Sequence, residues 1–204
     1  MREISRTEWR SLPKKRFSGG KKRENQVQRQ RSMWYVVWIR TGQEEKLKQM
    51  CEILIGQSQV YEECFIPKTE TVRRIRGVLS RRENILFPGY LFFDSADPAA
   101  LYEQLKKIPE FTKLLGADGV PKPLYPHEEE FLKSLSDEDK VIRISKGYLI
   151  GDELTVTDGP LKSCRGQLVH IDRHKREAKL RVDFLGDRRT VTVGLEVIKK
   201  EETK

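Results

Sequence analysis

Long apolar runs, paired cysteines and an apolar leader are all missing from this 204-residue chain. No stretch reaches the roughly 18 apolar residues that a membrane-spanning helix needs, so we expect no contact with a membrane. The N-terminus lacks the apolar core of a secretory signal. Only three cysteines occur, Cys51, Cys64 and Cys164, and no two are spaced as a Cys-x-x-Cys pair. A disulfide framework or zinc cluster is therefore not expected, and a reducing cytoplasmic location fits.

Signatures of catalysis are missing as well. The chain has no G-x-x-x-x-G-K-[ST] phosphate loop and no nucleophile motif. His170 and His174 are four residues apart, but they flank a predicted strand–turn boundary, whereas a zinc pair at this spacing needs a helix. Glu128, Glu129 and Glu130 are consecutive, so they fan around a helix and do not converge on a metal. We expect no catalytic residue, no metal, no cofactor and no enzyme activity.

Positive charge is concentrated at one end of the chain. The net charge is +9, and residues 1–32 hold eleven Lys and Arg but only three acids, so the rest of the chain is nearly neutral. A run of this kind is usually a solvated, disordered extension, although basic tails also bind nucleic acid loosely. We expect residues 1–32 to be such a tail, and we rest no function on it.

Residues 33–134 alternate between strand and helix patterns. Strands are expected where aromatic and β-branched residues cluster, and helices where apolar residues recur at i, i+3 and i+4. Asp97 and Pro98 suit the start of a helix. The polar segment 69–83 is predicted to be turn-like around Gly77, as the tip of a hairpin. An α+β domain follows, with helices on an antiparallel sheet; the expected strands are 33–41, 61–68, 85–95 and 110–116, and the expected helices are 43–56, 97–108 and 123–135.

The helical period disappears after residue 147. A polar connection over 135–147 is predicted to be a mobile linker, and short alternating runs separated by turn residues then predict a small all-β barrel over 148–204. These runs are rich in β-branched residues, which favours strands over helices.

The segment GDELTVTDGPLKSCRGQLVHID, residues 151–172, has residue types that suit two strands joined by a tight turn. Leu154 and Val156 share one face of a strand, and Asp158-Gly159-Pro160 makes a tight turn in which glycine supplies the positive φ. Gly166 is expected at a point where a side chain would collide. The segment resembles the KOW motif.

A second resemblance lies upstream of the KOW-like segment. WYVV at 34–37, an amphipathic helix, LFPGYLFF at 86–93 and the glycine and prolines of 119–124 resemble the N-terminal (NGN) domain of NusG-type transcription elongation factors. That domain precedes a KOW barrel in the same order, so the resemblance covers about residues 33–200. It implies an apolar depression that docks onto the clamp helices of RNA polymerase. The residues matching its lining are Trp38, Phe87, Pro88, Tyr90, Phe92 and Leu115.

The rings of LFPGYLFF are expected on two faces of one strand. Tyr90 and Phe92 share one face, and Leu91 and Phe93 share the other. One face can therefore be core while its opposite is a docking patch for a partner; the alternative is that helices cover all of the rings.

Residues 68–82 carry six basic side chains and one acid, Glu70. Arginine can grip phosphates with two hydrogen bonds and can stack on unpaired bases. The run FIPKTETVRRIRGVLSRRENILFPGYLFF resembles the LoaP group of specialised NusG paralogs, which implies a processive antiterminator recruited by an RNA hairpin in the leader transcript. A solvated loop face is the alternative reading. The candidate RNA contacts are Arg40, Gln43, Lys68, Arg73, Arg74, Arg76, Arg81 and Arg82.

The resemblance leaves other functions open. A housekeeping NusG-type elongation or termination factor would lack sequence-specific RNA binding, and a ribosome-associated KOW protein would bind RNA without polymerase. A ribosomal protein or a termination factor is a candidate partner of the barrel. We expect a monomer.

Overall fold

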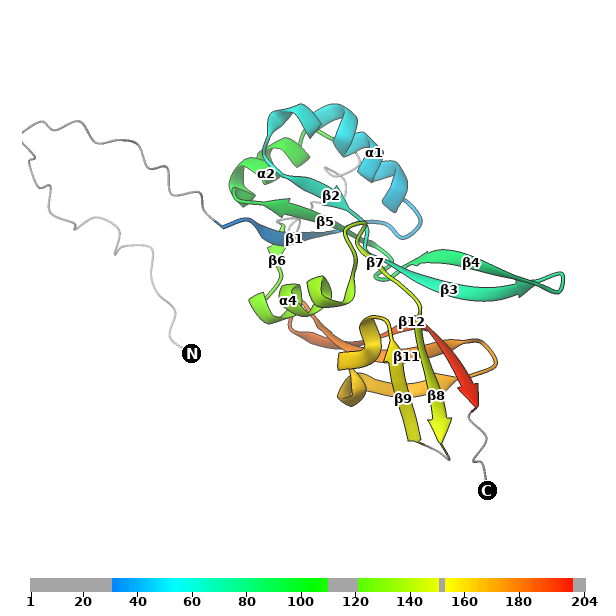
Figure 1. The fold of residues 1–204 in the computed structure, drawn as a ribbon. Coiled ribbons are helices and arrows are strands. Elements are labelled where there is room, and N and C mark those ends of the chain that lie inside the picture. The colour runs from blue at the N-terminus through cyan, green and yellow to red at the C-terminus, as the bar shows by residue number, and fades with distance from the viewer. Residues whose placement is uncertain (1–30, 110–120, 151–152, 200–204) are drawn as a thin grey trace, which may run out of the picture.

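The computed structural model describes residues 31–109, 121–150 and 153–199 (Figure 1). Three predictions fall outside these residues: the disordered tail, apart from its last two residues, the strand over 110–116, and the role of Leu115.

An antiparallel sheet organises the first part of the chain. Its central strands pair from Met33 with Ser95 to Trp38 with Tyr90. Because every pair in the sheet is antiparallel, the predicted architecture is confirmed. The strand order is β2-β5-β1-β6, where β1 is Met33–Trp38, β2 is Glu63–Phe65, β5 is Tyr90–Ser95 and β6 is Lys122–Pro123.

Two helices cover one face of this sheet, and a third lies on the opposite side (Figure 1). Leu91 and Phe93 of β5 are fully buried in a cluster that includes Leu47 and Leu101 of the covering helices. The Asp97 carboxylate accepts a 2.9 Å hydrogen bond from the amide of Ala100, which confirms the predicted helix start. The covering helices are α1 (Glu44–Ile55), followed by the 3-10 turn η2 (Gly56–Ser58), and α2 (Pro98–Leu105); the third is α4 (Pro126–Leu135).

A long hairpin projects from the domain where a polar turn was predicted. Strands β3 (Lys68–Ile75) and β4 (Val78–Ile85) pair along eight residues each. The turn itself is only Arg76 and Gly77, with φ values of 50° and 85°, the mirror-image turn that hairpins prefer. The prediction was right about the tip and wrong about the extent, because polar side chains on both faces hide the strand alternation.

The connection between the two parts, which was predicted to be a polar linker, contains a short strand with buried side chains. Within 135–147, Val141 and Ile142 form β7, which pairs in parallel with the start of β3, and both side chains are buried. Strand β8 then begins at Ser145. The domain boundaries drawn from the sequence stay a prediction.

The C-terminal β-domain, residues 145–199, contains a five-stranded sheet of order β10-β11-β12-β8-β9. This matches the predicted all-β character and is consistent with a KOW domain. Its elements are β8 (Ser145–Ile150), β9 (Glu153–Asp158), the 3-10 turns η3 (Pro160–Ser163) and η4 (Arg165–Gln167), β10 (Leu168–Asp172), β11 (Glu177–Phe184) and β12 (Asp187–Lys199).

The two glycines of the KOW-like segment behave differently. Gly159 has φ 91°, and a Cβ there would lie 2.7 Å from the Cα of Ser145, so the predicted need for glycine is confirmed. The prediction for Gly166 is wrong, since nothing lies within 4 Å of its Cβ position.

This contrast gives a test of the β-domain. Gly159→Ala is expected to cost about 1–3 kcal/mol in the free energy of unfolding, because its backbone conformation is nearly restricted to glycine and its neighbour is main chain. Denaturant titration of the full chain measures the loss, with Gly166→Ala as the matched control. Equal stability of the two variants would contradict this packing.

Candidate functional site: an aromatic sheet face and an arginine ribbon

The face of the sheet turned away from α1 and α2 is lined with aromatic rings. We call it the aromatic face; it comprises Trp34, Val36 and Trp38 of β1 and Tyr90 and Phe92 of β5. These strands place Trp38 opposite Tyr90 and Val36 opposite Phe92, and directly paired residues share a face. The two-faced strand predicted from the sequence is confirmed, since Leu91 and Phe93 belong to the cluster under the helices.

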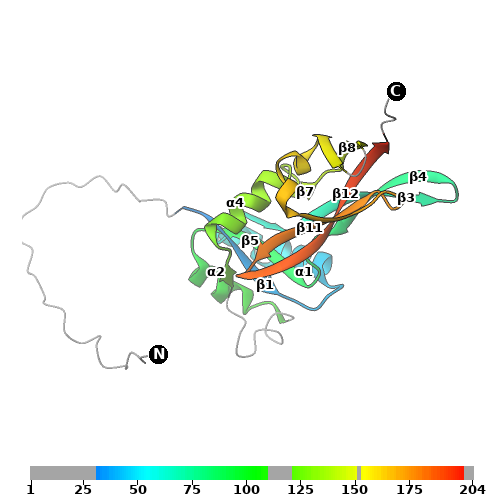
Figure 2. The ribbon, with the colours of Figure 1, turned by 90° about the horizontal axis from the view of Figure 1, so that it is seen from below.

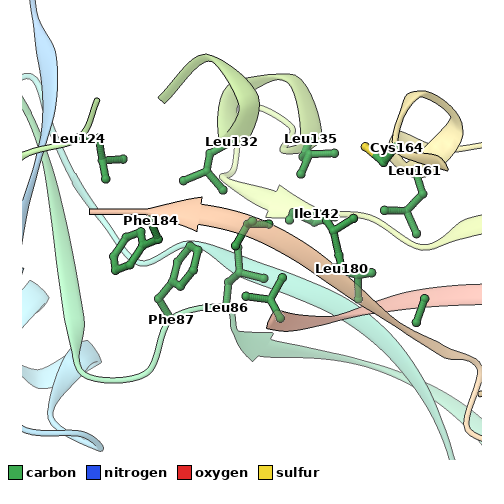
Figure 3. Close-up of a cluster of buried hydrophobic side chains, with 14 of the residues drawn as sticks. Leu86, Phe87, Leu124, Leu132, Leu135, Ile142, Leu161, Cys164, Leu180 and Phe184 are labelled. Carbon is green, nitrogen blue, oxygen red and sulfur yellow. The ribbon is translucent and has the colours of Figure 1, made fainter. Parts of the chain in front are cut away.

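The C-terminal β-domain covers this face with one aromatic side chain (Figure 3). Phe184, the last residue of β11, stacks on Phe87 with ring centroids 4.2 Å apart and planes 10° from parallel. It also meets Tyr90 edge-on at 5.0 Å and lies 5.9 Å from Phe92. A single hydrophobic cluster therefore joins the two parts of the chain.

Hydrogen bonds hold the tip of the β11–β12 hairpin beside this contact. The buried Glu128 carboxylate of α4 accepts the amides of Leu185 at 3.2 Å and Gly186 at 2.8 Å. The Arg189 guanidinium donates to the Tyr90 hydroxyl at 3.0 Å and lies 5.2 Å from the centre of its ring. Together with Phe184, these groups fix the β-domain against the aromatic face.

The predicted polymerase-binding residues fall into two groups. Phe87 and Phe92 are buried, and Tyr90 is partly buried. Phe184 contacts all three rings, and Phe92 also packs against Trp34 and Phe65 of its own domain. Trp38, 60% exposed, and Pro88 face solvent. The predicted surface is thus closed in this arrangement of the chain, and its role stays a prediction.

Glu44 shapes the loops at the exposed edge, and sequence reasoning missed it. Its buried carboxylate accepts the Gly89 amide and the Gly42 amide, each at 2.7 Å. The first glycine follows Pro88, and the second lies in the turn between β1 and α1. The sequence signal was an acid at the first helical position, which usually indicates only favourable contact with the helix dipole.

Glu44→Ala is expected to destabilise the chain by about 1–3 kcal/mol, because two amides lose their only described acceptor in a partly buried site. The neighbouring Glu45→Ala removes a carboxylate whose side chain is 56% exposed and pairs with Lys68, so it should cost less than about 1 kcal/mol. Thermal or urea unfolding of both variants measures the difference. If Glu44→Ala destabilised the chain no more than Glu45→Ala does, the Glu44 carboxylate would not hold these loops.

The arginine ribbon is the β3–β4 hairpin with its five exposed arginines. Register places Val72 opposite Arg81 and Arg73 opposite Ser80. Since strand side chains alternate, Arg74 and Arg81 share one face, Arg73 and Arg82 share the other, and Arg76 sits at the tip. The sequence predicted one basic cluster, whereas the ribbon presents cations on both of its faces.

The other three predicted RNA contacts lie away from the ribbon's outer half. Arg40 and Gln43 are on the β1–α1 turn, beside the loops held by Glu44. Lys68 begins β3, about 23 Å of strand from Ile75 at the far end, and its ammonium pairs with Glu45 at 2.8 Å. The fold therefore does not gather all eight residues into one site.

Arg143 ties the connection to the ribbon. Its guanidinium contacts Glu83 of β4 at 3.3 Å and also pairs with Asp137 and Asp139. The hydrogen bond to Asp137 raises the pKa of Arg143. Burial alone would raise the pKa of Asp137, but hydrogen bonds from the Val141 amide and Arg143 outweigh it and lower that pKa. This contribution to stability is present above the ordinary pKa of aspartate and is lost as pH falls through the lowered value.

An acidic cleft of about 770 Å³ lies beside α1 and the connection. Seven of its lining residues are acidic and two are basic, so it would repel phosphate. Within the described parts of the chain, no group of three or more His, Cys, Asp or Glu could hold a metal ion.

These features define the class: an α+β domain with an aromatic sheet face and a cationic hairpin, followed by a β-domain. A family model described as "Transcription termination factor nusG" matches residues 32–133. The transcription termination/antitermination protein NusG of Rickettsia prowazekii is 29% identical over 173 residues, which are 83% of this chain and 90% of that protein. The NusG protein of Thermus thermophilus is also 29% identical, over 167 residues that are 75% of this chain and 90% of that protein. A solved structure, "Domain interaction in Thermotoga maritima NusG", covers 81% of this chain and 93% of its own at 20% identity, with a TM-score of 0.44.

The chain belongs to the NusG family, because the family model spans half of it. It is a NusG-type transcription termination/antitermination factor and not an enzyme, as the sequence predicted. None of the helices in the described residues is long and apolar enough to span a bilayer.

Proposed function

We propose that this chain is a specialised NusG-type antiterminator of the LoaP kind. The aromatic face binds the clamp helices of RNA polymerase, and the arginine ribbon binds an RNA hairpin in the leader transcript. Together they promote processive readthrough of terminators. The C-terminal β-domain, once released, recruits a further partner such as a ribosomal protein or a termination factor.

The observation that carries the proposal is the aromatic face itself. Its rings lie outside the cluster under α1 and α2; Tyr90 meets Phe184 of the β-domain edge-on, and the adjoining Phe87 stacks on the same ring. A surface that binds one aromatic anchor in this way suits a protein partner, since such anchors dominate interface energies. A ribosome-associated RNA binder has no need of it. Polymerase can reach the face only when the β-domain has moved away.

Polymerase binding is tested at the exposed edge of the face. Trp38→Asp should weaken binding to core RNA polymerase at least about tenfold, because the tryptophan is 60% exposed and can act as a hot spot without being needed for the core. Ile53→Asp, on an α1 residue that is 79% exposed, is the matched control. Pull-down titrations compare the two, and equal affinities would contradict the proposed surface.

Antitermination is tested by transcription in vitro across a terminator. The proposal expects readthrough to rise only when the transcript carries an RNA hairpin that the chain binds. A housekeeping factor would act equally on transcripts with and without that hairpin, and that outcome would reject the LoaP-like part of the proposal.

A further inference from the structure

The tip of the arginine ribbon carries exposed aliphatic side chains beside its cations. Val78 is 69% exposed and Leu79 is 46% exposed, and both directly follow the turn at Arg76 and Gly77. Both views show this tip projecting beyond the two domains (Figure 1 and Figure 2). Single exposed apolar residues are common on proteins, but here two adjacent ones lie at the end of a projecting element in which every charged residue from 73 to 82 is an arginine.

The register gives the two faces of the ribbon the same composition. Directly paired residues share a face, and the side chains along one strand alternate between faces. Each face therefore carries one exposed aliphatic residue near the turn and two arginines beside or behind it. One face holds Leu79, Arg74 and Arg81, and the other holds Val78, Arg73 and Arg82.

Two of these arginines also contact a carboxylate of the chain. Arg73 lies 3.9 Å from Glu177, and Arg81 lies 3.4 Å from Glu70. Each contact involves one terminal nitrogen, and the two arginine side chains are 65% and 68% exposed. Because a guanidinium has five N–H donors, both arginines keep donors for phosphate oxygens.

Cations on two opposite faces need phosphates on two sides of the ribbon. A single strand or the outside of a helix presents phosphates to one face only, whereas a groove has a phosphate backbone along each wall and base edges at its floor. A two-stranded β-ribbon fits the major groove of B-form DNA, but the major groove of A-form RNA is too narrow and deep for side chains to read. An RNA that accepts this ribbon must therefore have a groove opened by unpaired nucleotides.

Unpaired bases also explain the aliphatic side chains at the tip. Sequence-specific recognition of RNA targets loops and bulges, whose bases are free to leave the stack. Val78 and Leu79 can remove apolar area from water by packing on the faces of such bases, and this contact does not depend on counterions. Arginine planes stack on unpaired bases as well, which lysine cannot do.

We propose that the tip of the arginine ribbon enters an RNA stem at a bulge or internal loop. Val78 and Leu79 pack on the unpaired bases there, while arginines on the two faces contact the phosphate backbones of the two strands. The aliphatic pair then determines which RNA is chosen, and the arginines supply most of the affinity. This inference rests on the proposed function, because it takes the ribbon as the RNA site.

The test uses the full chain and an RNA stem–loop selected from a random pool on that chain. A second RNA keeps the same stem and terminal loop, but the unpaired nucleotides within the stem are removed or paired. The wild type should bind the selected RNA at least about tenfold more tightly than the fully paired RNA, as expected when two aliphatic side chains lose their contacts.

The double variant Val78→Ser and Leu79→Ser should lose this preference. Its affinity for the selected RNA should fall on the order of tenfold, while its affinity for the fully paired RNA and the salt dependence of binding stay unchanged, because no charge is removed. Ile198→Ser with Ile150→Ser is the matched control, since these β-domain residues are 73% and 44% exposed. Val78→Ile with Leu79→Met keeps the apolar surface and should bind as the wild type does.

The outcomes separate this inference from the proposed function. If the selected RNA has a continuous stem, or if the serine variant weakens binding to both RNAs alike, insertion of the tip is refuted and the ribbon remains the RNA site. If the chain binds a duplex DNA of equal length more tightly than the selected RNA, the ribbon belongs in a DNA groove and both fail. If selection enriches no RNA, the proposed RNA site fails, and the inference fails with it.

Discussion

Alanine in place of Gly194 is expected to raise the affinity of the chain for core RNA polymerase by about 10- to 100-fold. The added methyl group would clash with the carbonyl oxygen of Glu70, which is a main-chain atom, so one of the two strands must move. The β-domain must therefore shift, which weakens the stacking of Phe184 on Phe87. Apparent affinity rises in proportion to the fraction of open chains, and a tenfold change needs only about 1.4 kcal/mol.

The control for this variant is Gly166→Ala, whose methyl group meets nothing within 4 Å. Titration against fluorescently labelled polymerase measures both. Unfolding curves check that Gly194→Ala keeps the stability of each domain, since its clash is with the other domain. Unchanged polymerase affinity in a variant whose domains have separated would show that the β-domain does not mask the binding surface.

The second large effect is expected from the arginine ribbon. Changing Arg73, Arg74, Arg76, Arg81 and Arg82 to alanine should abolish binding to an RNA stem–loop selected from a random pool on the full chain, without unfolding the domain, because all five are exposed. With about six phosphate contacts, affinity of the wild type should also fall roughly 10³-fold between 50 and 200 mM salt.

The matched control removes five exposed cations of the β-domain instead: Lys162, Arg173, Lys175, Lys179 and Arg181. Both variants lose the same positive charge, so a general electrostatic effect would weaken the RNA binding of both to the same extent. Electrophoretic mobility shift or anisotropy titrations at two salt concentrations separate the cases. Tight binding by the folded ribbon variant, or equal loss in both, would reject the ribbon as the RNA site.

Local patterns in the sequence predicted the elements that obey them. Asp97 capped its helix as expected, and the alternation of Tyr90, Leu91, Phe92 and Phe93 placed two side chains on each face of β5. The β3–β4 hairpin was underestimated because its polar side chains carry no apolar period; its length comes from pairing and from the turn at Gly77.

Contacts between distant segments could not be predicted in this way. Phe184 ends an alternating run in which Leu180 and Val182 are core residues, so nothing in the run shows that its last ring reaches another domain. Glu128 would be interpreted as a residue of the helix start, yet it binds the turn at Gly186, 58 positions later. Such contacts depend on how the two folded domains pack against each other, and the local sequence pattern around each residue does not show this.

The most direct test of the central claim is a photo-cross-linking experiment on the Gly194→Ala chain mixed with core RNA polymerase. A photoreactive phenylalanine analogue replaces Trp38 at the exposed edge of the aromatic face, or Ile53 on α1 as the control. We predict cross-links from position 38 to the clamp helices and none there from position 53. Cross-linking from position 53 alone, or from neither position in a complex shown to have formed, would contradict the aromatic face as the polymerase-binding surface.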